Sequence, residues 1–168
     1  MAYDDHFQHA DDVIAHLDTV VPILLNPLLK TKYAGFVTVA AVTVYELAIK
    51  EIFCEFGRRK HKVLGAFSES YFNRINGRIT LDDIKKDYCR RYGDTYVSKF
   101  KKKLDAATNV YFAAHHRDLK NSYSNLIVWR NSFAHDGKVP AMVTYTEVVQ
   151  AYQDGKEVIH SLASSMVR

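Results

Sequence analysis

The chain contains 168 residues, a length that corresponds to a single domain. Apolar residues make up 48% of the sequence, which is enough to build a buried core, and charged residues make up 25%. The formal net charge of +4 permits binding to a polyanion but does not demand it. Only 7 Gly and 3 Pro occur, which argues against a protein of many short strands and turns.

The sequence shows no sign of secretion or of membrane insertion. No apolar segment typical of a signal peptide occurs near the start of the chain. The richest apolar run, residues 35–47, is interrupted by Glu46 and is too short to span a bilayer. Cys54 and Cys89 lack the spacing of a metal site, and we interpret them as reduced thiols. We therefore expect a cytoplasmic protein without membrane contact.

Two helices are predicted in the first third of the chain. The first begins near residue 4, is kinked by Pro22, and ends or changes direction at Asn26-Pro27. The second covers residues 31–56, and its first half is apolar nearly all round, as expected of a helix surrounded by others. Its buried stripe nevertheless contains one carboxylate, Glu46.

A cationic cluster, residues 57–62, follows the second helix. Cations at a helix C-terminus interact favourably with the helix dipole, which is one explanation of the cluster. Contact with a phosphate backbone is the other explanation. A short helix over residues 62–74 is expected next, and Asn76-Gly77 then turns the chain.

Three further segments of the chain have helical signals. Thr80 and Asp83 resemble a cap and predict a helix over residues 81–91, after which a long helix begins at residue 94 or 95. Thr144, with glutamate three positions later, forms a capping box at the start of the last helix. With the segment described next, these helices predict one all-α domain over residues 1–168, a bundle of six or seven helices.

The penultimate helix, residues 119–133, places an arginine in an apolar stripe. This stripe contains the following residues at spacings of three and four: Leu119, Tyr123, Leu126, Arg130 and Phe133. The guanidinium of Arg130 keeps its charge, so it needs a carboxylate, a phosphate or water. His135 lies roughly 140° further round an ideal helix. The two side chains converge only if the helix ends near Ala134, or if a second copy of the chain supplies one of them.

Glu46 and Arg130 each occupy a position that the helical pattern reserves for an apolar side chain. A buried carboxylate without a partner is costly. Two interpretations remain open: Glu46 is a surface residue at the wetter end of its helix, or Glu46 meets Arg130 and each residue explains the other.

The segment Arg130-Asn131, followed by residues 132–134 and His135, resembles the motif of the HEPN family. Its place at the end of the penultimate long helix, and a long apolar helix that carries Glu46, fit the same pattern. Residues 57–93 match nothing diagnostic. The resemblance implies a HEPN-like fold and a metal-independent endoribonuclease that acts as a homodimer, with the two motif copies at the interface. Such proteins commonly serve as toxins or defence nucleases in prokaryotes.

The resemblance also implies roles for individual residues. The ribose 2′-OH attacks the adjacent phosphate and leaves a 2′,3′-cyclic phosphate and a 5′-OH end. His135 is expected to act as general acid or base, Arg130 to stabilise charge on the phosphate, Asn131 to orient either group, and Glu46 to hold Arg130. The candidate RNA-binding residues are Arg58, Arg59, Lys60 and Lys138. We expect no metal and no cofactor; the expected partners are RNA, a second copy and an antitoxin or regulator.

Other interpretations of these residues remain. His135 is also explained as a helix C-terminal histidine that meets open carbonyls, and Arg130 as part of a structural ion pair. The whole protein is alternatively a non-catalytic helical module that binds RNA or another protein. A third alternative is a metal-dependent hydrolase that uses His6, His9 and His115, whose activity EDTA would abolish.

Overall fold

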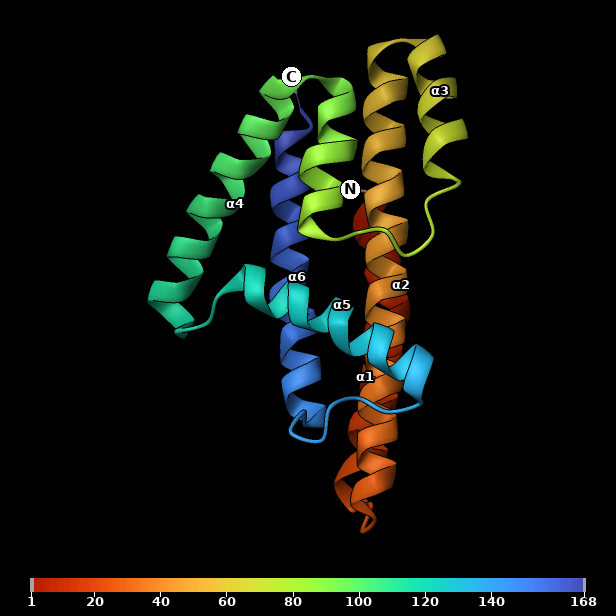
Figure 1. Ribbon diagram of the computed structural model, residues 1–168, viewed down its shortest axis with the longest axis vertical. Helices are drawn as coiled ribbons and strands as arrows, with labels where there is room; N and C mark the ends of the chain where they lie inside the picture. The colour runs from red at the N-terminus through yellow and green to blue at the C-terminus, as the bar shows by residue number, and fades with distance from the viewer. Residues whose placement is uncertain (1, 168) are drawn as a thin grey trace.

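A computed structural model describes residues 2–167, which fold as an all-α bundle without strands (Figure 1). The described elements are, in order, η1 (Ala2–His6), α1 (Phe7–Val20), η2 (Val21–Ile23), α2 (Pro27–Lys60), α3 (Lys62–Phe72), η3 (Asp83–Tyr88), η4 (Cys89–Tyr92), α4 (Asp94–His115), α5 (Leu119–Asp136) and α6 (Tyr145–Ser165). This architecture confirms the predicted fold class and the expected number of helices.

Helix α2 is the central element and runs nearly the full length of the molecule (Figure 1). Its 34 residues correspond to about 51 Å at the rise of an α-helix. It packs against α1, α3, α5 and α6. Tyr45, at its middle, is fully buried and stacks between Tyr123 of α5 and Tyr152 of α6, so that this part of the core joins three helices.

Helix α5 crosses α2, and a glycine permits their close approach (Figure 1). A Cβ atom built on Gly35 of α2 would lie 2.1 Å from Cδ2 of Phe133 of α5. The ring of Phe133 also meets that of Phe36 edge to face, with centroids 5.4 Å apart. Any larger side chain at position 35 would therefore push the end of α5 away from α2.

Two predicted boundaries and one predicted helix type differ from the structure. Helix α2 begins at Pro27, because Asn26 accepts a hydrogen bond from the backbone N–H of Leu28 at 2.9 Å and caps it. From Asp83 to Tyr92 the chain winds in a π-helix and a 3-10 turn, where a regular α-helix was expected. Helix α5 continues through His135 to Asp136, and Gly137, with φ of 67°, ends it.

In the region from residue 2 to residue 167, no helix has both the length and the apolar content needed to cross a bilayer.

Candidate functional site

Arg130 lies half-buried on α5 and makes one hydrogen bond. Its Nη2 donates to the carbonyl oxygen of Gly77 at 3.3 Å. Its Nε is buried and has no hydrogen-bond partner, and within residues 2–167 no carboxylate lies at ion-pair distance from the guanidinium. An unpaired buried donor is costly, and in native proteins it often marks a functional group or a site for a further ligand. Arg130 thus keeps donor capacity that the described protein does not use.

Glu46 is not the direct partner of Arg130, so the hypothesis of an ion pair between them is wrong. Its Oε2 accepts a hydrogen bond from the backbone N–H of Gly77 at 2.6 Å. Its Oε1 accepts one from Nζ of Lys50 at 2.6 Å, one turn along α2. Lys50 therefore supplies the opposite charge that Glu46 needs, while both Glu46 and Arg130 reach Gly77.

His135 and Asn131 are exposed on α5 and do not converge with Arg130. Because α5 continues to Asp136, His135 keeps its helical position, roughly 140° round the axis from Arg130. A helix end near Ala134 is thereby ruled out as the means of bringing the two side chains together. Within residues 2–167 neither His135 nor Asn131 makes a side-chain hydrogen bond. Two ways for Arg130 and His135 to meet were considered above, and of these only the contribution of one residue by a second copy of the chain remains.

Exposed apolar side chains lie beside the motif. Val128, Asn131 and His135 follow one another at spacings of three and four, so they share one face of α5. The exposed fraction of Val128 is 57%, and that of Phe36, which contacts Phe133, is 52%. Apolar side chains exposed to this extent next to a charged motif are typical of an interaction surface.

The four candidate RNA-binding residues do not form one cluster. Arg58 is held by Glu69, with Nε 2.7 Å from its Oε1, and also by Glu51; Arg59 pairs with Glu55. Lys60 lies over the ring of Phe56, 5.1 Å from its centroid. These three residues end α2 at one end of the molecule (Figure 1). Lys138 follows α5 instead, and it borders a shallow hollow with Ser132 and Asp136.

A second set of cations, which shares Lys60 with the first, faces solvent without ion pairs in the described part of the chain. Lys99, Lys102 and Lys103 share one face of α4 and border a hollow with Val167. Val167 also borders the neighbouring hollow at the end of α2, where Lys60 lies. We refer to Lys60, Lys99, Lys102 and Lys103 as the α4 cationic surface. Three of these lysines lie within one helical turn of the sequence, residues 99–103, but they were not among the candidate RNA-binding residues above.

Asp154 of α6 is a buried polar centre that the sequence did not reveal. The exposed fraction of its side chain is 1%. It accepts hydrogen bonds from four side chains: Tyr111 (2.6 Å), Ser122 (2.7 Å), Arg117 (3.1 Å to each oxygen) and Gln150 (3.1 Å). Although burial acts to raise the pKa of Asp154, these hydrogen bonds together hold it below the usual value. The arrangement joins the end of α4 and the start of α5 to α6.

The histidines considered as metal ligands lie on separate elements. His6 belongs to η1, His9 to α1 and His115 to the end of α4. Between residues 2 and 167, no three side chains of His, Cys, Asp or Glu gather as a metal site would require.

The comparisons with known proteins give one match. A family model described as RiboL-PSP-HEPN matches residues 5–168, essentially the whole chain. No curated protein and no solved structure matches the chain significantly. The match includes residues 57–93, which had shown no diagnostic pattern, and it associates the chain with a group of RNA-related proteins.

Proposed function

Because the chain belongs to the RiboL-PSP-HEPN family, we propose that it is an endoribonuclease that cleaves RNA without a metal ion. The main support for this proposal is that most hydrogen-bond donors of Arg130 have no partner in the described residues. Its guanidinium is half-buried and permanently charged, it has no carboxylate partner within residues 2–167, and it donates one hydrogen bond to the carbonyl of Gly77. An anion that meets the remaining donors at Nη1 and Nη2 would be bound favourably.

The proposed reaction is an in-line attack within the RNA itself. The ribose 2′-oxygen forms a bond to the adjacent phosphorus, and the bond between phosphorus and the 5′-oxygen of the next nucleotide breaks. One histidine accepts the proton of the 2′-OH, and a second, protonated histidine donates a proton to the leaving 5′-oxygen. Arg130 stabilises the charge that grows on the phosphoryl oxygens, and Asn131 orients the phosphate or an imidazole. The products carry a 2′,3′-cyclic phosphate and a 5′-OH.

The geometry of α5 supports a site that two copies of the chain share. In one chain, His135 and Arg130 diverge, and only one His135 is available for two proton transfers. A two-fold axis near the outer face of α5 would bring the His135 side chains of both copies towards one phosphate. Val128 and Phe36 would be buried at such an interface. In a cell, the enzyme would act as a toxin or defence nuclease held in check by a partner protein.

The test is a cleavage assay with purified protein in EDTA. We expect a chimeric oligonucleotide with a single ribonucleotide to be cut at that position, and the matched all-deoxy oligonucleotide to remain intact. Mass spectrometry should find a cyclic phosphate on the upstream product. His135→Ala should abolish cleavage, whereas His115→Ala, on the distant end of α4, should not. Cleavage of the all-deoxy strand, or loss of activity in EDTA, would refute the mechanism.

The rival function is a non-catalytic module that binds RNA or a protein. It predicts that RNA binds without being cut and that His135→Ala changes nothing in the assay. The α4 cationic surface is compatible with both functions, because it provides charge for a phosphate backbone whether or not cleavage follows.

A further inference from the structure

The connection between α3 and η3 passes directly beside Arg130. At its centre, Gly77 is held from both sides: its N–H donates to Glu46 at 2.6 Å, and its carbonyl accepts from Arg130 at 3.3 Å. Glu46 belongs to α2 and Arg130 to α5. Gly77 thus bridges Glu46 and Arg130, which the sequence had suggested as a direct ion pair.

Any residue other than glycine at position 77 would displace the guanidinium of Arg130. Its φ is 68°, a left-handed conformation that other residues adopt at a cost. A Cβ atom on Gly77 would lie 2.8 Å from Nη2 and 3.3 Å from Nη1 of Arg130. Since the tip of an arginine is flexible, the guanidinium would move, and the hydrogen bond to the carbonyl of residue 77 would be lost.

The same connection is fixed by a hydrogen bond to each of three successive carbonyls. Arg130 donates to that of Gly77, Tyr88 to that of Arg78, and Tyr123 to that of Ile79, the last at 2.6 Å. Both tyrosines are fully buried, and burial raises the pKa of each well above its usual value, so both stay protonated donors. Backbone carbonyls that lie against a core need such partners.

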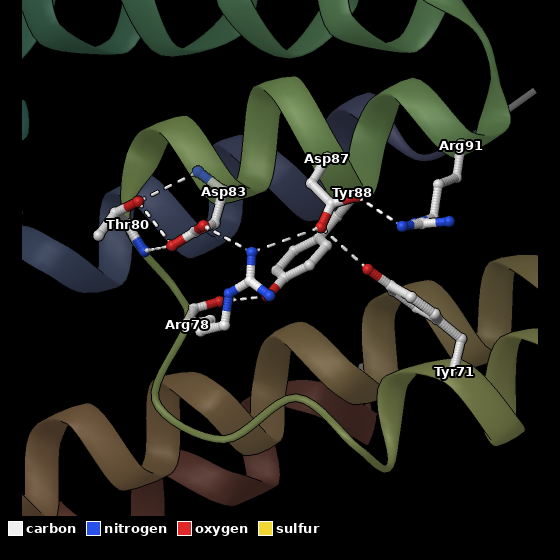
Figure 2. A network of polar contacts seen from close by, with 7 residues as sticks. All are labelled: Tyr71, Arg78, Thr80, Asp83, Asp87, Tyr88 and Arg91. Atoms are coloured by element: carbon white, nitrogen blue, oxygen red, sulfur yellow. Dashed lines mark hydrogen bonds and ion pairs between the residues drawn. The ribbon is translucent and has the colours of Figure 1, made fainter.

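Charged side chains fix the far side of the connection, as Figure 2 shows. The guanidinium of Arg78 lies between Asp83 and Asp87, with Nη2 3.7 Å and 3.9 Å from their nearest oxygens. Thr80 caps the following turn, with its Oγ1 2.7 Å from Oδ2 of Asp83. Asp87 in turn accepts a hydrogen bond from Tyr71 of α3 at 2.9 Å, so both ends of the connection are anchored to each other.

We propose that Gly77 is a positioning residue for Arg130, and that residues 76–80 form a rigid strap whose task is to aim the guanidinium. The carbonyl of Gly77 fixes the Nη2 arm, and the Nη1 arm, which has no partner among the described residues, is left for a phosphoryl oxygen. Glu46 acts indirectly, because its carboxylate accepts the hydrogen bond from the N–H of Gly77. This inference rests on the proposed endoribonuclease function, and it gives a role to a segment without a diagnostic motif.

The first test is Gly77→Ala, with Gly93→Ala as the matched control. Gly93 also has a positive φ, of 109°, but a Cβ atom there would meet nothing within 4 Å. Both variants bear backbone strain, and only Gly77→Ala displaces Arg130. We expect kcat for RNA cleavage to fall about tenfold or more in Gly77→Ala, with KM nearly unchanged. Gly93→Ala should keep the wild-type kcat at a temperature where it is folded.

A second measurement follows Arg130 without RNA. In a 1H–15N NMR spectrum, the buried Nε–H of Arg130, assigned by its absence in Arg130→Lys, should exchange slowly with solvent. It should exchange faster in Gly77→Ala and stay protected in Gly93→Ala. The proposal requires both results; a fall in kcat with unchanged exchange, or faster exchange with unchanged kcat, overturns it. Wild-type protein that cuts no RNA instead refutes the proposed function itself.

Glu46 provides a variant pair should Gly77→Ala fail to fold. Glu46→Gln keeps an oxygen that accepts from the N–H of Gly77, whereas Glu46→Ala removes it. We expect Glu46→Gln to restore most of the kcat lost in Glu46→Ala, together with the protection of the Arg130 Nε–H. Equal losses in the two variants would show that the charge of Glu46 matters and the strap does not.

Discussion

Glu46 and Arg130 form no ion pair with each other, yet both hydrogen-bond to Gly77, one to its N–H and the other to its carbonyl. The relationship differs physically from the ion pair that we had expected. In an ion pair, each residue stabilises the charge of the other. Here Lys50 neutralises Glu46, and the charge of Arg130 remains available to a ligand.

This relationship predicts that Glu46 and Arg130 are coupled in catalysis. Arg130→Ala should lower kcat by about 100- to 1,000-fold, because a charged donor to the transition state is lost. Glu46→Ala should lower kcat about tenfold through misplacement of Arg130. In single-turnover assays, the double variant should be no less active than Arg130→Ala alone. Fully additive losses would mean that the two residues act separately.

The exposed face of α5 provides a test of the proposed dimer. Val128→Glu would place a charge on the face that carries His135, so we expect a monomer that has lost most of its ribonuclease activity. Val110→Glu on α4 is the matched control, because its side chain is exposed to a similar degree, 72%, away from the motif. Light scattering and the cleavage assay measure the two effects. A dimer that persists in Val128→Glu with full activity would exclude this face as the interface.

The ion pairs predict which cations would hold RNA if the protein has the proposed function. Replacing Lys99, Lys102 and Lys103 together by alanine should weaken binding about tenfold and lower the slope of log K against log salt by about 2. Arg58→Ala should change affinity little, since Glu69 and Glu51 already hold its guanidinium. Fluorescence anisotropy with an all-deoxy strand of the same sequence as the RNA substrate measures both. An equal loss of affinity in the two variants would contradict the assignment of RNA binding to the three lysines of α4.

The buried carboxylate of Asp154 predicts a pH-dependent contribution to stability. Its hydrogen bonds lower its pKa, so the folded state favours the ionised form. That contribution is complete above the ordinary Asp pKa of about 3.9 and is lost as the pH falls through the lower folded value. At pH 7, Asp154→Asn should reduce the free energy of unfolding by about 3 kcal/mol, because the amide NH2 group cannot accept the hydrogen bonds that Tyr111, Ser122 and Arg117 donate to the buried carboxylate.

The difference in unfolding free energy between wild type and Asp154→Asn should shrink below about pH 4. Urea unfolding at a series of pH values measures it. Asp82→Asn serves as the control, because Asp82 is exposed and pairs with Lys86, one turn away. It should leave the free energy of unfolding nearly unchanged. A difference for Asp154→Asn that stays constant down to pH 3 would show that ionisation of Asp154 is not what stabilises the fold.

Local sequence was enough to predict most helices. At the start of α6, Thr144 and Glu147 form the expected reciprocal hydrogen bonds, because a capping box uses only groups three residues apart. Asn26-Pro27 was interpreted as the end of one helix, and its role as the start of α2 was missed. The same dipeptide suits both positions, and only the packed structure shows which helix it belongs to.

The sequence alone determined that Arg130 stands in an apolar stripe and therefore needs a polar partner. What that partner is was decided by tertiary structure: a backbone carbonyl 53 residues earlier, in a segment without a recognisable motif. Helical periodicity reports which face of α5 turns inward, because that depends on local geometry. It carries no information about which group of a distant segment meets that face. Every residue has a backbone carbonyl, so the sequence cannot reveal which one meets Arg130. The packing of α2, α3 and η3 places the carbonyl of Gly77 there.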